Sequence, residues 1–338
     1  MLHFLKGDSM AKTKRIGIIA SGGDAQGMNA CMKTIVAMAD RKGMEVVAFL
    51  GGYQGLLDND TKILTLKDVE RSFNLGGSII LSGRSKDFMD IEKRKKAKVV
   101  YDKHKLEGII VLGGDGSIRG AKDLEDLGLN VVVIPCTIDN DVFCSERSIG
   151  FDTAVNNAVD AIDNIQQTMS ANGRVLIIEV MGRYCGDIAL YSGLCSESDI
   201  IMIPEKQQTV GKIIREVQKQ LDAGNISPTV IIAEHQFDVQ EVAKQMENIF
   251  QKECRAVVLG YIQRGGAPTV QDRLLAVRMA VQSMECALNN EFGVVVSLQK
   301  DEIKLVNFEK AIKSKRKFRE DIWNTFIDLK RYATVKQK

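Results

Sequence analysis

Two acids follow a strand-like run in the stretch IPCTIDND, residues 134–141. Asp139 and Asp141 come shortly after the apolar residues, and Thr137 adds a hydroxyl group to the same turn. Ligands of parallel sheets bind at the carboxyl ends of the strands, where this turn is expected to lie. A carboxylate there can accept the proton of a hydroxyl group that attacks a phosphoryl group. The alternative is an Asx-turn network, in which the acids bond only to nearby backbone.

Two glycine-rich stretches follow other strand-like runs and lead into helical patterns. They are SGGDAQGMN, residues 21–29, and GGDGSIRGA, residues 113–121. Glycine lets backbone N–H groups approach a phosphate, and the amino end of a helix favours negative charge. The first stretch matches no dinucleotide or P-loop motif, and a tight turn without a ligand would look alike. Asp115 is placed to hold a magnesium ion on a polyphosphate, with a helix N-cap as the alternative.

Arginines stand beside several of the apolar runs. Arg183 follows one of them in EVMGRYCGD, residues 179–187, where its guanidinium could stabilise charge on a transferring phosphoryl group. Arg174, Arg255 and Arg264 flank others. Each alone would be a surface ion pair, and together they would bind a substrate phosphate. The residues thus indicate phosphoryl transfer onto a phosphorylated hydroxyl compound.

These residues need elements that bring them together, and β-rich runs alternate with helix-length patterns along the chain. The expected strands cover residues 15–20, 45–50, 108–114, 130–135, 174–180, 199–204, 229–234, 256–262 and 293–298. Continuous apolar strands separated by helices indicate parallel sheets covered on both faces. We therefore expect an α/β fold with two Rossmann-like three-layer lobes, mostly parallel sheets and an active site in the cleft between them.

The bulk composition excludes several classes of protein. Lys and Arg number 46 against 44 Asp and Glu, so the charge gives no reason to expect nucleic acid or an anionic membrane as a partner. Seven scattered cysteines without a CxxC pair are typical of reduced intracellular thiols. No apolar run reaches the roughly 18 residues of a membrane span. We expect a cytoplasmic protein.

Two kinds of segment are expected to lie outside the chemistry. Residues 1–14 are expected to form an N-terminal extension, because the patterned sequence begins at Arg15. The basic runs at residues 92–98 and 313–319 fall on helical patterns. A solvated helix face explains such runs better than an anion site does.

Six motifs, in order and spacing, resemble the bacterial-type ATP-dependent 6-phosphofructokinase family. They are SGGDAQGMNA, GGDGS, TIDND, EVMGRYCGD, AEH and VLGYIQRGG. The resemblance extends from about Arg15 into the C-terminal region. It implies phosphorylation of fructose 6-phosphate at its 1-hydroxyl to give fructose 1,6-bisphosphate in glycolysis, with ATP as co-substrate and Mg²⁺ as cofactor.

The resemblance also implies a role for each site residue. Asp139 would be the base, and Arg183 and Thr137 would steady the transferring phosphoryl group. Asp115, with Asp141 nearby, would serve the magnesium ion and the transition state. The ATP site would be lined by Gly23, Tyr53, Arg84, Gly116, Ser117 and Gly120. The sugar-phosphate site would be formed by Met181, Glu234, Tyr261, Arg264 and, from a neighbouring subunit of a homotetramer, Arg174 and Arg255.

The chain would then divide into two lobes that it enters more than once. The nucleotide-binding lobe would comprise residues 15–150 and about 263–313. The sugar-phosphate-binding lobe would comprise residues 151–262 and about 314–338.

Several positions depart from the family pattern. Cys136 replaces a glycine that accompanies ATP as donor, or a lysine that accompanies pyrophosphate; because a thiol lacks the lysine's charge and Gly116 is kept, we favour ATP. Cys136 could still crowd the nucleotide. Tyr261 replaces a histidine and cannot carry positive charge near neutrality, so substrate affinity should be lower. Gln26 replaces a proline and Leu81 a small residue, which loosens the donor-site match.

The effector site of the family also differs here. The corresponding positions carry Lys33, Ala37, Leu66, Gln166, Ala223, Asn225 and Ser227. Only Lys33 keeps a charge, so we expect no response to ADP or phosphoenolpyruvate. Two alternatives stay open: a catalytically weak paralogue that acts as a regulatory subunit, and a pyrophosphate-dependent enzyme. A dinucleotide-binding protein is disfavoured, because no acid follows the first glycine turn at the ribose-binding distance.

Overall fold

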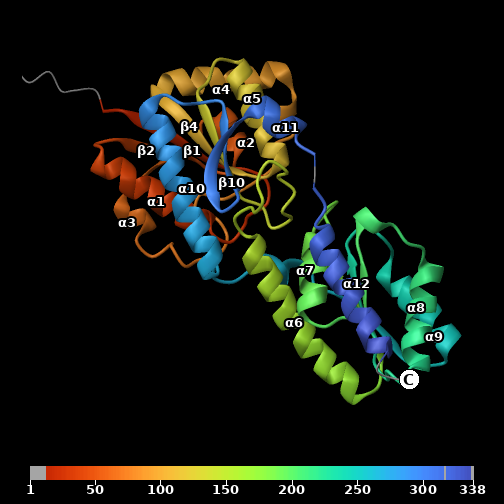
Figure 1. The fold of residues 1–338 in the computed structure, drawn as a ribbon. Coiled ribbons are helices and arrows are strands. Elements are labelled where there is room, and N and C mark those ends of the chain that lie inside the picture. Colours follow the sequence, from red (N-terminus) through yellow and green to blue (C-terminus); the bar gives the residue numbers. More distant parts are fainter. Residues whose placement is uncertain (1–12, 316, 336–338) are drawn as a thin grey trace, which may run out of the picture.

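The structure is a computed structural model that describes residues 13–315 and 317–335. The expected N-terminal extension, residues 1–14, lies for the most part outside the described residues. Two sheets organise the rest, and the expected α/β class is confirmed. We call the elements around the seven-stranded sheet the larger lobe and those around the four-stranded sheet the smaller lobe (Figure 1).

The larger sheet has the strand order β11-β10-β5-β4-β1-β2-β3. Its five inner strands are parallel, while β3 and β11 pair antiparallel at the two edges. Side chains alternate between the two faces, so that β5 sends Val132 and Ile134 into one core and Val131 and Val133 into the other. The strands are β1 (Arg15–Ala20), β2 (Glu45–Phe49), β3 (Thr61–Leu64), β4 (Leu106–Gly113), β5 (Val131–Pro135), β10 (Val294–Gln299) and β11 (Glu302–Asn307).

Helices cover both faces of the larger sheet, as continuous apolar strands require. One face is covered by α1 (Met28–Arg41) and α10 (Val270–Asn289), which pack against each other (Figure 1). The other face is covered by α4 (Ile91–His104), α5 (Asp115–Asp126) and α11 (Phe308–Lys313). Shorter helices are α2 (Tyr53–Asp58), α3 (Leu66–Val69) and the 3₁₀ turn η1 (Asp87–Met89).

The smaller sheet is wholly parallel, in the order β7-β8-β6-β9. Its strands are β6 (Val175–Val180), β7 (Ile200–Met202), β8 (Thr229–Ala233) and β9 (Cys254–Val258). Its helices are α6 (Phe151–Ala171), α7 (Asp187–Cys195), α8 (Val210–Asp222), α9 (Val239–Phe250) and α12 (Glu320–Val335), together with the 3₁₀ turn η2 (Pro204–Lys206). The helices α8 and α9 lie on one face, with α6 and α7 on the other (Figure 1).

Two expected elements are wrong. The strand predicted over residues 256–262 ends at Val258, which pairs with Glu179 of β6. Gly260, with φ of 54°, then opens the 3₁₀ turn η3 (Gly260–Arg264). The helix predicted through residues 313–319 is interrupted, because Ser314 has extended backbone and α12 begins only at Glu320. The edge strands β3 and β11 were not expected. No helix within the described part of the chain is long and apolar enough to span a membrane.

Candidate active site

A cavity of about 670 Å³ lies where the carboxyl ends of strands from both sheets meet. The loops after β1, β4, β5, β6 and β8 all reach it, as strand-end binding predicts. Its walls bring together most of the predicted site residues: Gly23, Tyr53, Arg84, Asp115, Gly116, Ser117, Gly120, Thr137, Asp139, Asp141, Met181, Arg183, Glu234 and Arg264.

The glycine-rich loop after β4 forms the larger-lobe wall. The N-cap of α5 is Gly114, so Asp115 is the first helical residue and the N-cap alternative for it is wrong. The glycines have different spatial reasons: a Cβ at Gly120 would lie 2.7 Å from the Tyr53 ring, whereas no described atom lies within 4 Å of a Cβ at Gly116. Gly120 therefore makes room for the Tyr53 ring, whereas Gly116 borders open space in the cavity.

Aromatic residues close the outer part of this wall. The Tyr53 hydroxyl donates to the backbone oxygen of Ser117 at 2.7 Å, and its ring stacks on Phe88 with centroids 4.2 Å apart. Burial raises the pKa of Tyr53, so its hydroxyl stays a donor. Phe88 lines the same cavity. The sequence analysis missed it because Phe88 lies in η1, which is outside the six motifs.

The turn after β5 holds the two acids between the lobes. The Asp139 backbone N–H donates to the Thr137 hydroxyl oxygen at 3.2 Å. Asn140 has left-handed backbone, with φ of 53°, and its side chain donates to the Asp187 carboxylate at 2.9 Å. Left-handed non-glycine residues persist where their surroundings hold them, and they cluster at functional sites. Asn140 thus anchors the turn to α7, leaving its neighbours directed at the cavity.

Asp139 has an electrostatic setting suited to a base. Burial, with Asp141 and Glu234 nearby, raises the pKa of Asp139 to about 6, while Arg183 and Arg264 oppose the rise. A general base works best when its pKa lies near the operating pH, provided that it remains ionised. At neutral pH this carboxylate is mostly ionised and is more basic than an ordinary aspartate.

Asp141 has one carboxylate oxygen, Oδ1, that is buried and unpaired among the described residues. Burial and the nearby Asp115 raise the pKa of Asp141. Asp115 itself forms an ion pair with Arg119 at 3.0 Å. Residues 13–315 and 317–335 contain no group of three or more His, Cys, Asp or Glu side chains that could hold a metal ion by themselves.

The smaller-lobe wall consists of side chains held by polar contacts. Arg183 has φ of 57°, and its backbone N–H donates to the Glu234 carboxylate at 2.7 Å. Arg264 is the last residue of η3 and forms an ion pair with Asp24 of the first glycine-rich loop. Its guanidinium also lies over the Tyr261 ring, 5.4 Å from the centroid. Two cationic side chains therefore face the region of Asp139 from the smaller-lobe side.

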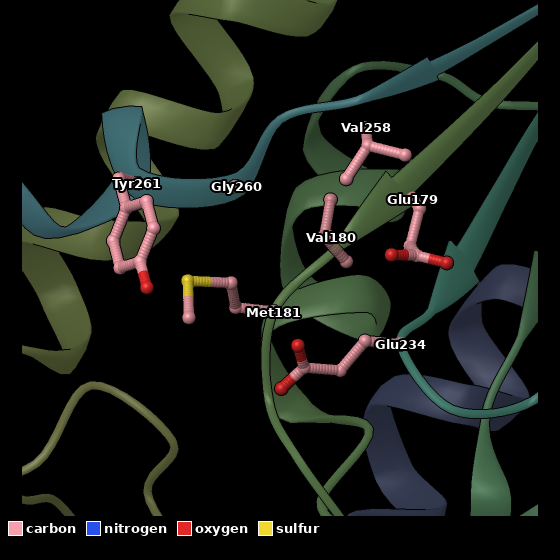
Figure 2. A pocket seen from close by; sticks show the side chains of 7 residues that line it. All are labelled: Glu179, Val180, Met181, Glu234, Val258, Gly260 and Tyr261. Carbon is pink, nitrogen blue, oxygen red and sulfur yellow. The ribbon is translucent and has the colours of Figure 1, made fainter.

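A second cavity of about 200 Å³ extends this wall between the ends of β6, β8 and β9. Figure 2 shows Tyr261 directing its hydroxyl at the Met181 side chain, with Glu234 on the other side of Met181. Tyr261 is 78% exposed, so its phenol is accessible. Burial, with Glu234 nearby, raises the pKa of Glu179 at the back of this cavity. Met181 and Glu234 line both cavities, which therefore lie next to each other.

Two predicted residues lie away from the cavity. Arg174 precedes β6 and Arg255 is the second residue of β9, so both lie at the amino ends of strands of the smaller sheet. Both form ion pairs with Glu253 there, at 3.2 Å for Arg255, as the surface-pair alternative describes. The structure does not bring them to the site of their own chain.

Cys136 and the effector positions can be placed as well. The Cys136 side chain is 1% exposed and belongs to the core covered by α1, where burial and Cys31 raise the pKa of its thiol. Cys136 nevertheless lines the larger cavity, so its crowding of a nucleotide stays a prediction. At the effector positions, the Lys33 ammonium donates to the backbone oxygen of Glu70 at 2.6 Å.

Comparison with known proteins gives consistent matches along the chain. The family model described as phosphofructokinase matches residues 15–287. A protein of Oceanobacillus iheyensis named ATP-dependent 6-phosphofructokinase is 40% identical over 288 residues, which is 85% of this chain and 90% of that protein. One of the same name from Clostridioides difficile is 39% identical over 305 residues, 90% of this chain and 96% of that protein.

Comparison with solved structures also finds phosphofructokinases. Phosphofructokinase from Saccharomyces cerevisiae superposes with a TM-score of 0.82 at 27% identity, covering 94% of this chain and 48% of that one. A pyrophosphate-dependent phosphofructokinase from Nitrosospira multiformis reaches a TM-score of 0.83 at 18% identity, covering 90% of this chain and 86% of that one, and so shares the fold. The chain belongs to the phosphofructokinase family.

Proposed function

We propose that this protein is an ATP-dependent 6-phosphofructokinase that converts fructose 6-phosphate to fructose 1,6-bisphosphate in glycolysis. The single observation that carries the proposal is the position of Asp139, which is half-buried and lines one cavity together with a glycine-rich loop and two arginines. The names of the relatives support ATP as donor and fructose 6-phosphate as acceptor.

Asp139 would act as the base. Its carboxylate would take the proton of the sugar 1-hydroxyl as that oxygen attacks the γ-phosphorus, and ADP would leave with the broken P–O bond. Thr137, which already orients the Asp139 backbone, and Arg183 would steady the transferring group. The charge built up on the phosphoryl oxygens would then face a guanidinium rather than water.

The larger lobe would hold ATP. The backbone N–H groups at the start of α5 and the open space at Gly116 suit a polyphosphate chain. Asp115 and Asp141 would hold Mg²⁺, since both line the cavity and the Asp141 Oδ1 is buried without a partner among the described residues. When bound, the ion would neutralise charge on the polyphosphate. The outer wall would be completed by Gly23, Tyr53, Arg84, Ser117 and Gly120.

The smaller lobe would hold the sugar phosphate. Tyr261, Met181 and Glu234 line the smaller cavity, and the Arg264 guanidinium lies over the Tyr261 ring and lines the larger one. Tyr261 can donate one hydrogen bond but carries no charge, so Arg264 would supply the main electrostatic attraction.

Arg174 and Arg255 would complete the site of a neighbouring subunit in a homotetramer. They lie at the amino ends of their strands, whereas the cavity lies at the carboxyl ends, so they do not line the cavity of their own chain. Mixing an inactive Arg174→Ala variant with an inactive Asp139→Ala variant, after subunit exchange, should restore part of the activity. Restoration fails if each chain supplies its own arginines.

The proposal is tested by product formation. The purified chain is assayed for fructose 1,6-bisphosphate with Mg²⁺ and fructose 6-phosphate, with ATP and pyrophosphate in separate reactions. Product with ATP supports the proposal, and product only with pyrophosphate reverses the donor. No product from either donor favours the regulatory paralogue. Added ADP or phosphoenolpyruvate should not change the rate beyond ordinary product inhibition.

We also propose a cytoplasmic location, because all seven cysteines are free thiols.

A further inference from the structure

Gln26 connects the two sides of the cavity without lining it. Its side chain is 0% exposed and belongs to the first glycine-rich loop, after β1. Its amide nitrogen donates to two backbone oxygens after β9, that of Gln263 at 2.9 Å and that of Gly265 at 2.8 Å. Both acceptors are neighbours of Arg264 in the chain. Gln26 thus holds the backbone on each side of that arginine.

Gln263 extends this connection to a third loop. Its side chain, also 0% exposed, accepts from the Met181 backbone N–H at 3.1 Å and donates to the Gly260 oxygen at 3.0 Å. The loops after β1, β6 and β9 are therefore joined by two buried amides. Each of these loops supplies a residue to the cavities described above.

The orientation of the Gln26 amide follows from its partners. Carbonyl oxygens only accept hydrogen bonds, so the amide must turn its NH₂ group towards both of them. This leaves Gln26 Oε1 buried, with no hydrogen-bond partner in the portion of the chain that is described. A buried unsatisfied oxygen costs stability, and an apolar side chain of similar size would avoid that cost. The two donated bonds are thus the property that distinguishes Gln26 from a packing residue.

We propose that Gln26 is a positioning residue for phosphoryl transfer, which fixes the Arg264 backbone against the loop that receives the donor phosphates. The inference rests on the proposed function. The ion pair between Arg264 and Asp24 joins the same two loops on the cavity side, but a phosphate competes for that guanidinium. The Gln26 side chain is 0% exposed and its bonds do not use the Arg264 guanidinium, so a phosphate at Arg264 would not compete for them. They therefore keep the acceptor phosphate site at a fixed distance from the donor.

The test uses Gln26→Met, which keeps the length of the side chain and removes both donors. A matched control is Gln299→Met, since Gln299 also donates to a backbone oxygen distant in sequence, that of Cys144 at 3.0 Å, and does not line the cavity. With Gln26→Met, kcat/KM for fructose 6-phosphate should fall by about tenfold to a hundredfold, because misplacement of reacting groups is costly. The KM for ATP should stay within about twofold, and the control should retain both parameters.

Equal losses for both substrates, or the same loss in the control, would overturn the inference, because either pattern is that of general destabilisation. Gln26→Glu gives a second variant. Its carboxylate cannot donate and would face two carbonyl oxygens, so its kcat/KM should fall below that of Gln26→Met. Activity equal to the wild type in this variant would contradict a role for the donated bonds.

Hydrogen exchange separates this inference from the proposed function. In Gln26→Met, the amides of residues 260–266 and of Met181 should exchange faster than in the wild type and in Gln299→Met. Unchanged exchange overturns the positioning role whatever the activity. Absence of phosphofructokinase activity in the wild type overturns the proposed function, and the exchange result then judges the Gln26 connection separately.

Discussion

The two walls of the cavity are built in different ways. The larger-lobe wall carries several glycines, and the space beside them is set by close contacts such as Gly120 against Tyr53. The smaller-lobe wall is made of long side chains, held by contacts between residues far apart in sequence, such as Arg264 with Asp24. Backbone recognition depends on the absence of side-chain atoms. Side-chain recognition depends on charge and on what holds it in place.

The two walls should also differ in how a substitution acts. Tyr261 is 78% exposed on the smaller-lobe wall, where a change alters one contact among several. At Gly113, by contrast, a Cβ would lie 2.3 Å from the Ser117 hydroxyl and 2.8 Å from the Ser21 backbone oxygen. One added carbon there would move the loop itself.

The largest effect is expected at Asp139, which lies between the two walls. Asp139→Asn keeps the shape of the side chain and removes the base, so turnover should fall by about 10²- to 10⁴-fold. Binding of ATP and of fructose 6-phosphate, measured separately by calorimetry, should remain. Loss of either binding event would instead give Asp139 a structural role in that wall.

A smaller effect, confined to one wall, is expected for Arg264→Leu. Removing a charge-assisted contact to a phosphate costs about 1.5 to 3 kcal/mol. The KM for fructose 6-phosphate should therefore rise by roughly tenfold to a hundredfold, with the KM for ATP nearly unchanged. Arg278→Leu is the control, because Arg278 pairs with the exposed Asp301 and lies outside the cavity. An equal rise in both KM values would show that the two walls are not independent.

The larger-lobe wall is tested by two alanine substitutions at glycines. In Gly116→Ala the new Cβ meets no described atom within 4 Å, so the melting temperature should be kept while the KM for ATP rises severalfold. In Gly120→Ala the Cβ would lie 2.7 Å from the Tyr53 ring, and overpacking should destabilise the fold by about 1 to 3 kcal/mol. Thermal unfolding and ATP titration of both variants check this. An unchanged KM for ATP in Gly116→Ala would show that ATP does not occupy the space at Gly116.

The smallest effect concerns pH. The base must be ionised, and burial with nearby acids raises the pKa of Asp139 to about 6, so kcat/KM should fall as the pH drops through that value. Asp141→Asn removes one of the negative charges that raise this pKa. The midpoint of the acid limb should therefore move to lower pH, even though the maximal rate is also reduced. A midpoint that stays in place or moves upwards would contradict the coupling of the two acids.

Much of the fold and site followed from local sequence, because loops that follow apolar strands meet at one edge of a parallel sheet. The expected strands other than that over 256–262 lie close to observed ones, and the motif residues line one cavity. The edge strand β11 was missed because its residues are mostly exposed and lack an apolar run. Phe88 lies outside every motif.

Contacts between distant residues were also beyond local patterns. The bonds from Gln26 reach Gln263 and Gly265, and nothing in either stretch predicts the other. The resemblance marks Gln26 only as a departure from proline. Its two hydrogen-bond acceptors become apparent only in the structure.

The path of the chain between the sheets has a consequence for synthesis. The smaller sheet uses one continuous stretch, from β6 to β9, whereas the larger sheet pairs β5 with β10, which is made only after that stretch. On the ribosome, β5 therefore waits with an open edge until Val294 and Val295 emerge to pair with Val132 and Val133. Open strand edges invite pairing with other chains. The nascent enzyme is thus most exposed to aggregation during the interval in which its smaller lobe is being translated.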